Sequence, residues 1–365
     1  MLICETCNKE YATGKFCIEC GNPLKEKPQE NACPKCGTII VTTGKFCTEC
    51  GAKLFQTDKE PDVVDNTKNE AEKAITLYQD KQYEEAFKLA KKLANEGNAG
   101  AQNLLGMCYN MGHGTAVEKT KAIYWYEKSA QHGYRAGQCH LAYCFFTGDG
   151  VEEDDEKAVF WFRKAAEQNH AGAQTMLGSC YYYGKGTEQN YEQAVAWFKR
   201  AADQKQSGGQ YYLGLCYLLG NGVKKNYEQA VVLFKSAADQ GHAKAQAMLG
   251  DCYYYGNGIS LDHEKAVSWY RKAAEQDNDY AQYSLGYCYK NGQGTSQDDR
   301  MASYWFKKAA ENGNEAAKKE LSDEEDNDLN QQPEEQDSHA FSINDTADYE
   351  TISLLNKIKN MYKLM

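Results

Sequence analysis

The chain has 365 residues, of which 42% are hydrophobic, 12% aromatic and 25% charged, a composition typical of a globular protein with two or three domains. No window approaches the roughly 18 apolar residues of a membrane helix, and the N-terminal MLICETCNKE lacks the pattern of a secretory signal. The net charge of −11 equals that of residues 321–350, so the rest has no basic excess of the kind that nucleic acid binds. We therefore expect a cytoplasmic protein, and we expect neither nucleic acid nor a membrane as its partner.

Residues 1–54 contain four CxxC pairs, which indicate metal sites. Two residues between a pair of thiolates let one tight turn present both to one ion, and a second pair completes the tetrahedral shell of structural zinc. The alternative is that these cysteines form disulfides or a redox CxxC motif, and the expected lack of a secretory signal argues against it. We predict two structural Zn²⁺ ions per chain. Their ligands are Cys4, Cys7, Cys17 and Cys20 for one ion, and Cys33, Cys36, Cys47 and Cys50 for the other.

The same region resembles the double zinc-ribbon modules found at protein termini, with CPKCG at Cys33 to Gly37 the most typical knuckle. The resemblance implies a small interaction module that depends on its metal for folding. Some zinc ribbons bind nucleic acid, so a nucleic-acid-associated regulatory factor is the alternative function. Residues 1–60 hold eight Lys and eight acidic residues, which argues against a phosphate-binding surface unless these charges segregate.

A linker at 55–68 is expected next, and then a short helix-turn-helix at 69–97 that caps the following helices. From residue 98 to 320 the chain repeats every 36 residues without an insertion or deletion, which indicates a solenoid of stacked units. The recurring residues are Cys108, Cys144, Cys180, Cys216, Cys252 and Cys288, Trp125, Trp161, Trp197, Trp269 and Trp305, and Gln102, Gln138, Gln174, Gln210, Gln246 and Gln282.

Each 36-residue unit is predicted to form two helices. The first ends at a GxG element, in which glycine suits a left-handed helix cap. The second carries the recurrent Trp, and we expect Trp197 to be a buried packing residue. Adjacent units are about one helix packing distance apart, roughly 8–10 Å, whereas a disulfide needs Cα atoms within about 7 Å. The recurrent cysteines should therefore remain buried free thiols.

The pattern LGxCYxxGxG…KAVxWYRKAAEQ resembles the Sel-one-like repeat, a relative of the tetratricopeptide repeat, over roughly residues 98–318. The resemblance implies an all-α, right-handed solenoid of helix pairs that scaffolds protein complexes. Two units depart from the pattern: one has Ala142 where the others have Gly, and the unit around Tyr211 lacks the Trp.

No catalytic residue is predicted, because no His keeps a spacing that would pair it with a Cys or Ser in a recurrent triad. His132, His170 and His242 fall in turns between units, where a polar turn residue is expected. His140 stands where other units have Leu104 or Met176, and we expect it to be exposed. The chain is therefore predicted not to be an enzyme.

The predicted partner-binding groove lies on the first helices. Rotation by 100° per residue puts the recurring positions on one arc and the variable positions on the opposite arc. The recurring arc should form the core, and the variable arc should bind other proteins through aromatic and apolar groups. The alternative is that these aromatic residues only cover neighbouring helices. The predicted contacts are Met107, Tyr143, Phe146, Tyr182, Tyr211, Leu215, Leu218, Asp251, Tyr254, Tyr283 and Tyr287.

The sequence thus predicts a non-catalytic scaffold or adaptor, with the zinc ribbons as a second interaction module. Residues 321–347 are acidic and poor in apolar groups, so a disordered linker is expected there. Residues 348–365 show the spacing of an amphipathic helix. Whether this helix caps the solenoid, binds a partner or lies on a membrane is left open, and so is the oligomeric state.

Overall fold

The computed structural model describes residues 2–4, 9–11, 25–26 and 66–329 of a chain that divides into two units, Met1–Asn66 and Thr67–Met365. In the first unit, β1 (Leu2–Cys4) pairs antiparallel with both β2 (Lys9–Tyr11) and β3 (Lys25–Glu26), in the order β2-β1-β3. Most of the predicted zinc-ribbon region and the segment 348–365 lie outside the described residues.

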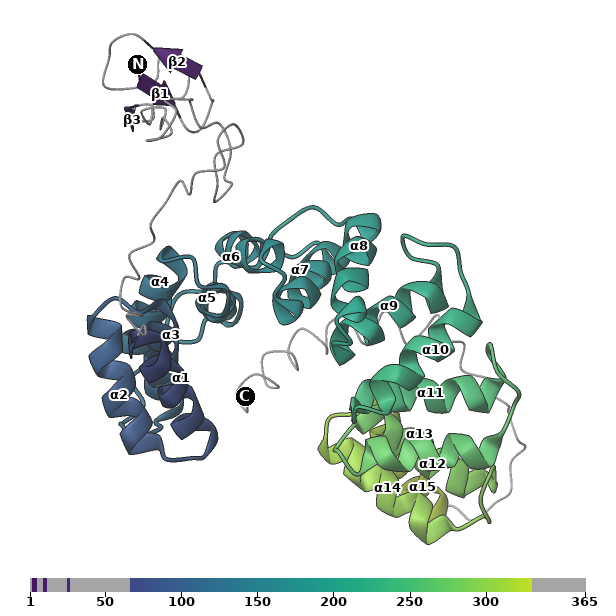
Figure 1. Ribbon diagram of the computed structural model, residues 1–365. Helices are drawn as coiled ribbons and strands as arrows, with labels where there is room; N and C mark the ends of the chain where they lie inside the picture. The colour runs from purple at the N-terminus through teal and green to yellow at the C-terminus, as the bar shows by residue number, and fades with distance from the viewer. Residues whose placement is uncertain (1, 5–8, 12–24, 27–65, 330–365) are drawn as a thin grey trace, which may run out of the picture. The chain divides into compact units, whose positions relative to one another are not determined.

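The second unit consists of helices, each of which packs against the next along the chain (Figure 1). We call α3 with α4 repeat 1, and so on to α13 with α14 as repeat 6. The helices are α1 (Asn66–Gln79), α2 (Tyr83–Asn95), α3 (Ala99–Met111), α4 (Lys119–Gln131), α5 (Arg135–Thr147), α6 (Asp155–Glu167), α7 (Ala171–Tyr183), α8 (Tyr191–Asp203), α9 (Ser207–Leu219), α10 (Tyr227–Ala238), α11 (Ala243–Tyr255), α12 (His263–Ala274), α13 (Asp279–Asn291), α14 (Asp299–Glu311) and α15 (Glu315–Leu329).

The first helix of every repeat ends at a left-handed glycine, as the sequence predicts. In repeat 3, Gly184 has a φ of 68°, and its N–H donates to the carbonyl of Cys180, the recurrent cysteine. The same bond closes the first helix of the other five repeats. The second glycine of GxG has a different role: a Cβ on Gly222 would overlap the carbonyl oxygen of Tyr191 in the preceding repeat. It is therefore the point where the backbones of adjacent repeats touch.

The core follows the 36-residue period. The six recurrent cysteines and Cys139 are buried free thiols, which confirms that prediction, and burial raises the pKa of Cys180 to about 12. The prediction for Trp197 is wrong in part, because this side chain is only half-buried and its neighbour Phe198 is fully buried. One residue is a step of 100° around the helix, so Phe198 points into the repeat while Trp197 lies at its edge.

The recurrent glutamine joins consecutive turns inside the solenoid. Gln174 is 1% exposed, donates to the carbonyl of Ala166 at 3.1 Å, and accepts from Nε2 of Gln204 at 2.7 Å. Gln246 makes the equivalent bonds with Ala238 and Gln276. Since a buried amide without partners is costly, the recurrence of Gln reflects this pairing of its oxygen and nitrogen with two different turns.

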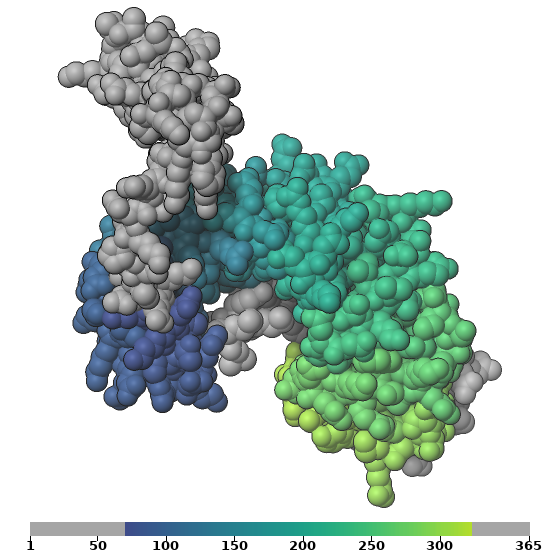
Figure 2. Space-filling view, in the orientation of Figure 1, coloured from purple at the N-terminus to yellow at the C-terminus, as the bar shows by residue number. Residues whose placement is uncertain are grey.

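Helix α15 continues to Leu329, nine residues beyond the end expected for the solenoid. The Asn314 side chain accepts from the N–H of Ala317 at 3.0 Å and so caps the start of the helix. No helix-breaking Gly or Pro follows before Pro333, so the sequence allows the helix to continue. In space-filling view the described helices form a continuous body in chain order, from purple-blue to yellow (Figure 2). Within the described residues, no helix has the length and apolar character that crossing a membrane requires.

Candidate functional site

The strand pairing at the N-terminus fits a zinc knuckle. Cys4 is the last residue of β1, and it stands opposite Lys9, the first residue of β2. A connection of four residues, which includes Cys7 in the sequence, therefore joins two antiparallel strands. A CxxC pair suits such a short connection, since two residues between the cysteines let both bind one ion. Cys7 and the other six predicted ligands lie outside the described residues.

The solenoid contributes no further metal site among the residues whose side chains are described, because none of their His, Cys, Asp and Glu form a group of three or more that could hold an ion. Two of the turn histidines cap helices: the ring Nδ1 of His170 accepts from the N–H of Ala173, and that of His242 accepts from the N–H of Ala245. Burial, with the nearby Lys244 charge, lowers the pKa of His242 to about 4, which keeps this nitrogen free to accept.

The expected exposure of His140 is wrong. Its ring is partly buried against Tyr126, with ring centres 5.1 Å apart, and its Nδ1 lies 2.7 Å from Oδ1 of Asn103 in the preceding repeat. Burial lowers the pKa of His140 to about 4. The residue therefore joins repeats 1 and 2 as a neutral side chain.

Part of the predicted groove is core, which corrects that prediction. Phe146, Tyr182, Tyr211, Leu218 and Asp251 are all at most 9% exposed. Phe146 packs edge-on against Phe162, and Tyr211 stacks on His242 at 5.0 Å. The Phe146 contact lies within repeat 2, between α5 and α6, whereas the Tyr211 contact joins repeat 4 to the start of repeat 5.

The other six predicted residues, Met107, Tyr143, Leu215, Tyr254, Tyr283 and Tyr287, are half-buried. The positions that remain open along the first helices are one before and three after the recurrent cysteine, which share one face because four residues turn the helix by 400°. We call these the first-helix surface. Its members that are at least partly exposed are Met107, Met111, Tyr143, Thr147, Tyr183, Leu215, Leu219, Tyr255, Tyr287 and Asn291, whereas Ser179 and Asp251 are buried.

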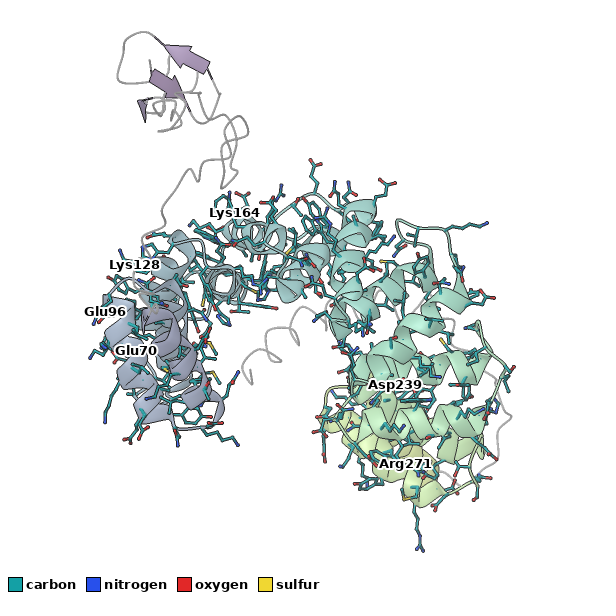
Figure 3. All side chains as sticks on the ribbon, in the orientation of Figure 1. Glu70, Glu96, Lys128, Lys164, Asp239 and Arg271 are labelled. Carbon is teal, nitrogen blue, oxygen red and sulfur yellow. The ribbon has the colours of Figure 1, made fainter. Side chains whose placement is uncertain are left out.

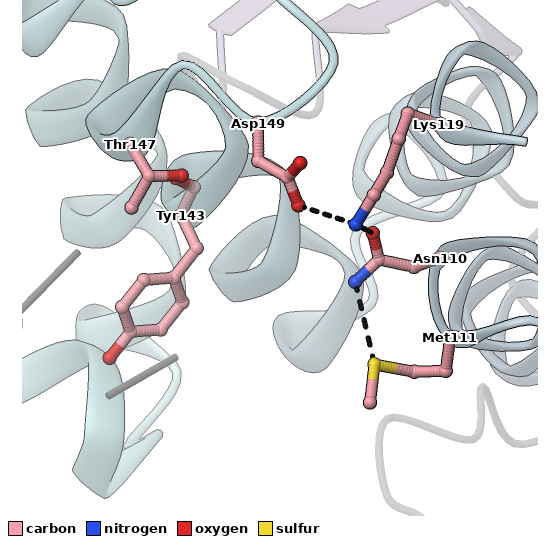
Figure 4. A network of polar contacts seen from close by, with 6 residues as sticks. All are labelled: Asn110, Met111, Lys119, Tyr143, Thr147 and Asp149. Carbon is pink, nitrogen blue, oxygen red and sulfur yellow. Dashed lines mark hydrogen bonds and ion pairs between the residues drawn. The ribbon is translucent and has the colours of Figure 1, made fainter. Parts of the chain in front are cut away.

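A polar network fixes the relation of repeats 1 and 2 beside this surface (Figure 4). Lys119, at the start of α4, donates to Oδ1 of Asn110 at 2.7 Å and pairs with Oδ2 of Asp149 at 2.9 Å. Tyr143 and Thr147 are one turn apart on α5, and the Thr147 hydroxyl donates to the Tyr143 carbonyl at 2.8 Å. The helices that form this surface are thus linked by hydrogen bonds and an ion pair, which pre-organises the surface for binding.

A second set of apolar groups lies on the second helices. Tyr124, Phe160, Val232 and Tyr304 are 47–58% exposed and share the position before the recurrent Trp. Lysines one turn later cover some of these rings, with Nζ of Lys128 5.6 Å from the Tyr124 ring centre and Nζ of Lys164 5.7 Å from that of Phe160. Figure 3 labels the two lysines, which lie on α4 and α6. The sequence analysis missed this set, although its 36-residue spacing is visible.

Comparison with known proteins agrees with this architecture. The Sel1 repeat family matches seven consecutive stretches, residues 71–98, 99–134, 135–170, 171–205, 207–242, 243–278 and 279–314. The first stretch covers most of the segment expected to be a cap. The double zinc ribbon family matches residues 4–51. No curated protein matches the chain.

Two of the similar solved structures are about one-third identical to this chain over the matched residues. A Sel1 repeat protein from Oxalobacter formigenes is 36% identical, with a TM-score of 0.62, over 66% of this chain and 96% of its own. The protective antigen c5321 of uropathogenic Escherichia coli strains, described as displaying an SLR fold, is 33% identical, with a TM-score of 0.58, over 71% of this chain and 57% of its own. With most of its length in matched repeats, the chain belongs to the Sel1 repeat family and carries an N-terminal double zinc ribbon.

Proposed function

We propose that the protein is a non-catalytic scaffold that binds other proteins through the first-helix surface. Sel1 and related repeats typically mediate protein–protein interaction, and Sel1 repeat proteins are usually not enzymes. The observation that carries the proposal for this chain is the composition of the first-helix surface. Its partly exposed positions differ from repeat to repeat and are rich in Tyr, Met and Leu. A rigid backbone with varied aromatic and apolar groups suits recognition of a protein surface.

The test compares two triple variants of the full chain. The first replaces Met107, Tyr143 and Leu215 by Gln, which removes apolar contacts from the first-helix surface of three repeats. The control replaces Tyr124, Phe160 and Val232 by Gln, which removes as many exposed apolar groups from the second helices.

A partner is first captured from native lysate, identified and purified, and its affinity for both variants is then measured by calorimetry. We expect the first variant to bind at least about tenfold more weakly, which corresponds to about 1.4 kcal/mol, and the control to bind like the wild type. Melting curves must show that both variants stay folded. Equal binding by the two variants, or loss in the control alone, would refute this location of the binding surface.

The zinc ribbons serve, in this proposal, as a second interaction module that holds two Zn²⁺ ions. The double zinc ribbon implies zinc binding, and the eight cysteines are enough for two tetrahedral sites. We also propose that the protein acts in the cytoplasm, where the free thiols of the repeats would stay reduced. Salt-dependent binding of DNA or RNA to the full chain would instead support a nucleic-acid-associated factor.

A further inference from the structure

The start of α14 has a charge that the other second helices lack. Arg300 is the second residue of α14, and the equivalent residue is Glu in repeats 2 to 5 and Thr in repeat 1. Acidic groups stabilise the start of a helix and basic groups destabilise it, because the positive end of the helix dipole lies there. We therefore expect a group outside α14 to favour the basic residue at this position.

Two further residues of α14 lie on the same side of the helix as Arg300. Spacings of four and seven residues place Tyr304 and Lys307 there. The three side chains line one shallow hollow on the surface of α14, and Asp299 and Ser303 line it as well. Two basic groups and an aromatic ring are thus exposed side by side.

Lys308 adds a third basic group at the edge of this hollow. Its Nζ lies 5.4 Å from the ring centre of Tyr304, which is 47% exposed, and 5.7 Å from that of Trp305. We call Arg300, Tyr304, Lys307 and Lys308 the α14 face. None of its basic groups forms an ion pair with an acidic residue that the structure describes. Asp299 offsets one of the three charges, so the face remains positive.

A buried donor beside the α14 face lacks an acceptor. Trp305 is 7% exposed, whereas the recurrent Trp of repeats 1, 2, 3 and 5 is only half-buried. Within residues 66–329, no group accepts a hydrogen bond from Nε1 of Trp305. Because a buried N–H without an acceptor destabilises a fold, we expect an acceptor from outside these residues.

The chain leaves α15 beside the start of α14. Residues 312–314 join the two helices, and a connection of three residues makes neighbouring helices antiparallel. Since α14 has 13 residues and α15 has 15, Leu329 at the end of α15 lies level with the first turn of α14. The segment that follows therefore begins close to Arg300.

The sequence of this segment has the complementary charge. Residues 330–350 contain six acidic residues and no Lys or Arg, whereas residues 348–365 contain three Lys and two acidic residues and so fit a basic face less well. Glu334 is five residues beyond Leu329, a reach of up to about 17 Å in extended chain. Arg300 and Lys307 are only about 10 Å apart along the helix axis, so the first acidic residues of the segment can reach the whole face.

We propose that Glu334, Glu335 and Asp337 bind the α14 face of the same molecule. Exposed ion pairs are individually weak, but the short connection to α15 raises the local concentration of these carboxylates to about the millimolar range, which favours their binding. The C-terminal end of the solenoid is then covered by the chain's own acidic segment. The α14 face is separate from the first-helix surface, so this proposal does not depend on the proposed function.

Lysine acetylation of the full chain tests the proposal, because a lysine beneath a bound segment reacts slowly. The native protein is treated briefly with sulfo-N-hydroxysuccinimide acetate, and mass spectrometry after digestion gives the rate at each lysine. The ionic strength is kept at about 0.01 M, where charges interact over about 30 Å. Lys128 and Lys164 are internal controls, since they occupy the position of Lys308 in repeats 1 and 2 and also lie over exposed rings.

The first variant replaces three acidic residues by amides: Glu334→Gln, Glu335→Gln and Asp337→Asn. We expect the acetylation rate at Lys307 and Lys308 to rise at least about threefold, because the segment no longer covers them. The rates at Lys128 and Lys164 should stay as in the wild type. In about 1 M salt, where the Debye length is about 3 Å, the wild type and the variant should react alike.

A matched variant removes the same charge farther along the segment, through Asp345→Asn, Asp348→Asn and Glu350→Gln. It should leave the rates at Lys307 and Lys308 as in the wild type, and melting curves should show that both variants stay folded. Equal rates in the wild type and the first variant, or an equal rise in both variants, would overturn the proposal. Protection that grows with protein concentration would also overturn it, since the carboxylates would then come from a second copy.

Discussion

Phe198 and Trp197 show how one step around a helix decides what a residue contributes to stability. Both are large aromatic residues on α8, but Phe198 is 0% exposed and touches the rings of Tyr182 and Tyr212, with centres 6.3 and 5.0 Å away. Trp197 is half-buried, and the Arg200 guanidinium lies 4.5 Å above its ring. In repeat 3 the Trp therefore lies at the edge of the repeat, and the Phe that follows it lies at the centre.

We expect Phe198→Ala to lower the free energy of unfolding by about 3–5 kcal/mol, because it leaves a cavity in a packed core. Trp197→Ala should lower it clearly less, since part of the Trp197 side chain already contacts water. Urea unfolding followed by circular dichroism measures both. Hydrogen exchange should show the damage of Phe198→Ala in repeat 3 and its neighbours, as nearest-neighbour coupling requires. An equal or larger loss in Trp197→Ala would contradict this assignment.

His242 links stability to pH. Its folded-state pKa of about 4 lies below the ordinary value of 6.5, so protonation favours the unfolded chain. The stability that neutral His242 contributes is present above pH 6.5 and is lost as the pH falls toward 4. Asn caps α3 and α13 in the same way, through Asn98 and Asn278, so His242→Asn should keep the cap.

The expected result is that His242→Asn matches the wild type near pH 8 and loses less stability between pH 6.5 and 4. Thermal melting at a series of pH values measures the difference, and the other titrating groups cancel because both proteins share them. A constant difference at all pH values would mean that His242 has the same pKa in the folded and the unfolded chain.

At the scale of the element, a positive φ and a close backbone contact are separate reasons for glycine, and only the second makes it necessary in every repeat. The turn into each first helix has one residue with positive φ, which is Gly97, Gly133 or Gly241 in some repeats and Asn169, Lys205 or Asp277 in others. Position 241 therefore tolerates a side chain, and nothing lies within 4 Å of a Cβ built there. The second glycine of GxG is Gly in all six repeats, because the backbone of the preceding repeat lies against it.

Gly222→Ala should therefore lower the free energy of unfolding by about 3 kcal/mol, since it combines a strained φ with an overlap against Tyr191. Gly241→Ala has the strain alone and should cost about 1 kcal/mol. Urea unfolding of both variants separates the two causes. If both variants lose the same free energy of unfolding, the contact between repeats adjusts at no cost, and Gly222 is needed only for its positive φ.

At the scale of the molecule, we expect the N-terminal region to hold the metal and the helices to fold independently of it. Metal analysis of the full chain under reducing conditions should give near two zinc equivalents, and a chain that begins at residue 60 should give none. Chelation should leave the helical signal almost unchanged, because the described helices contain no group of side chains that could hold an ion. A full chain without zinc would contradict the proposed ligands, and loss of helicity on chelation would mean that the ribbons support the solenoid.

The repeat architecture and much of its interior could be predicted from the sequence by itself. Six cysteines at intervals of 36 residues give the length of the repeat and locate six of the helix pairs, since any insertion would break the period. The family match adds a seventh stretch at residues 71–98, which lacks this cysteine. The glycine caps follow from local backbone sterics, and the free thiols follow from the spacing of stacked helices. The caps depend on the sequence of a single repeat, and the free thiols depend only on the distance between neighbouring repeats. Comparison of the repeats with one another is therefore enough to predict both.

Only the tertiary structure decided which variable positions are open. Tyr211 and Leu215 both vary between repeats and lie on the same side of α9, but Tyr211 is buried against α10 and the start of α11 while Leu215 remains partly exposed. Variation at a position shows only that the packing there differs from repeat to repeat. Whether its neighbour is another helix or solvent depends on how each first helix is rotated against the next, and that angle follows from the side chains of both repeats together.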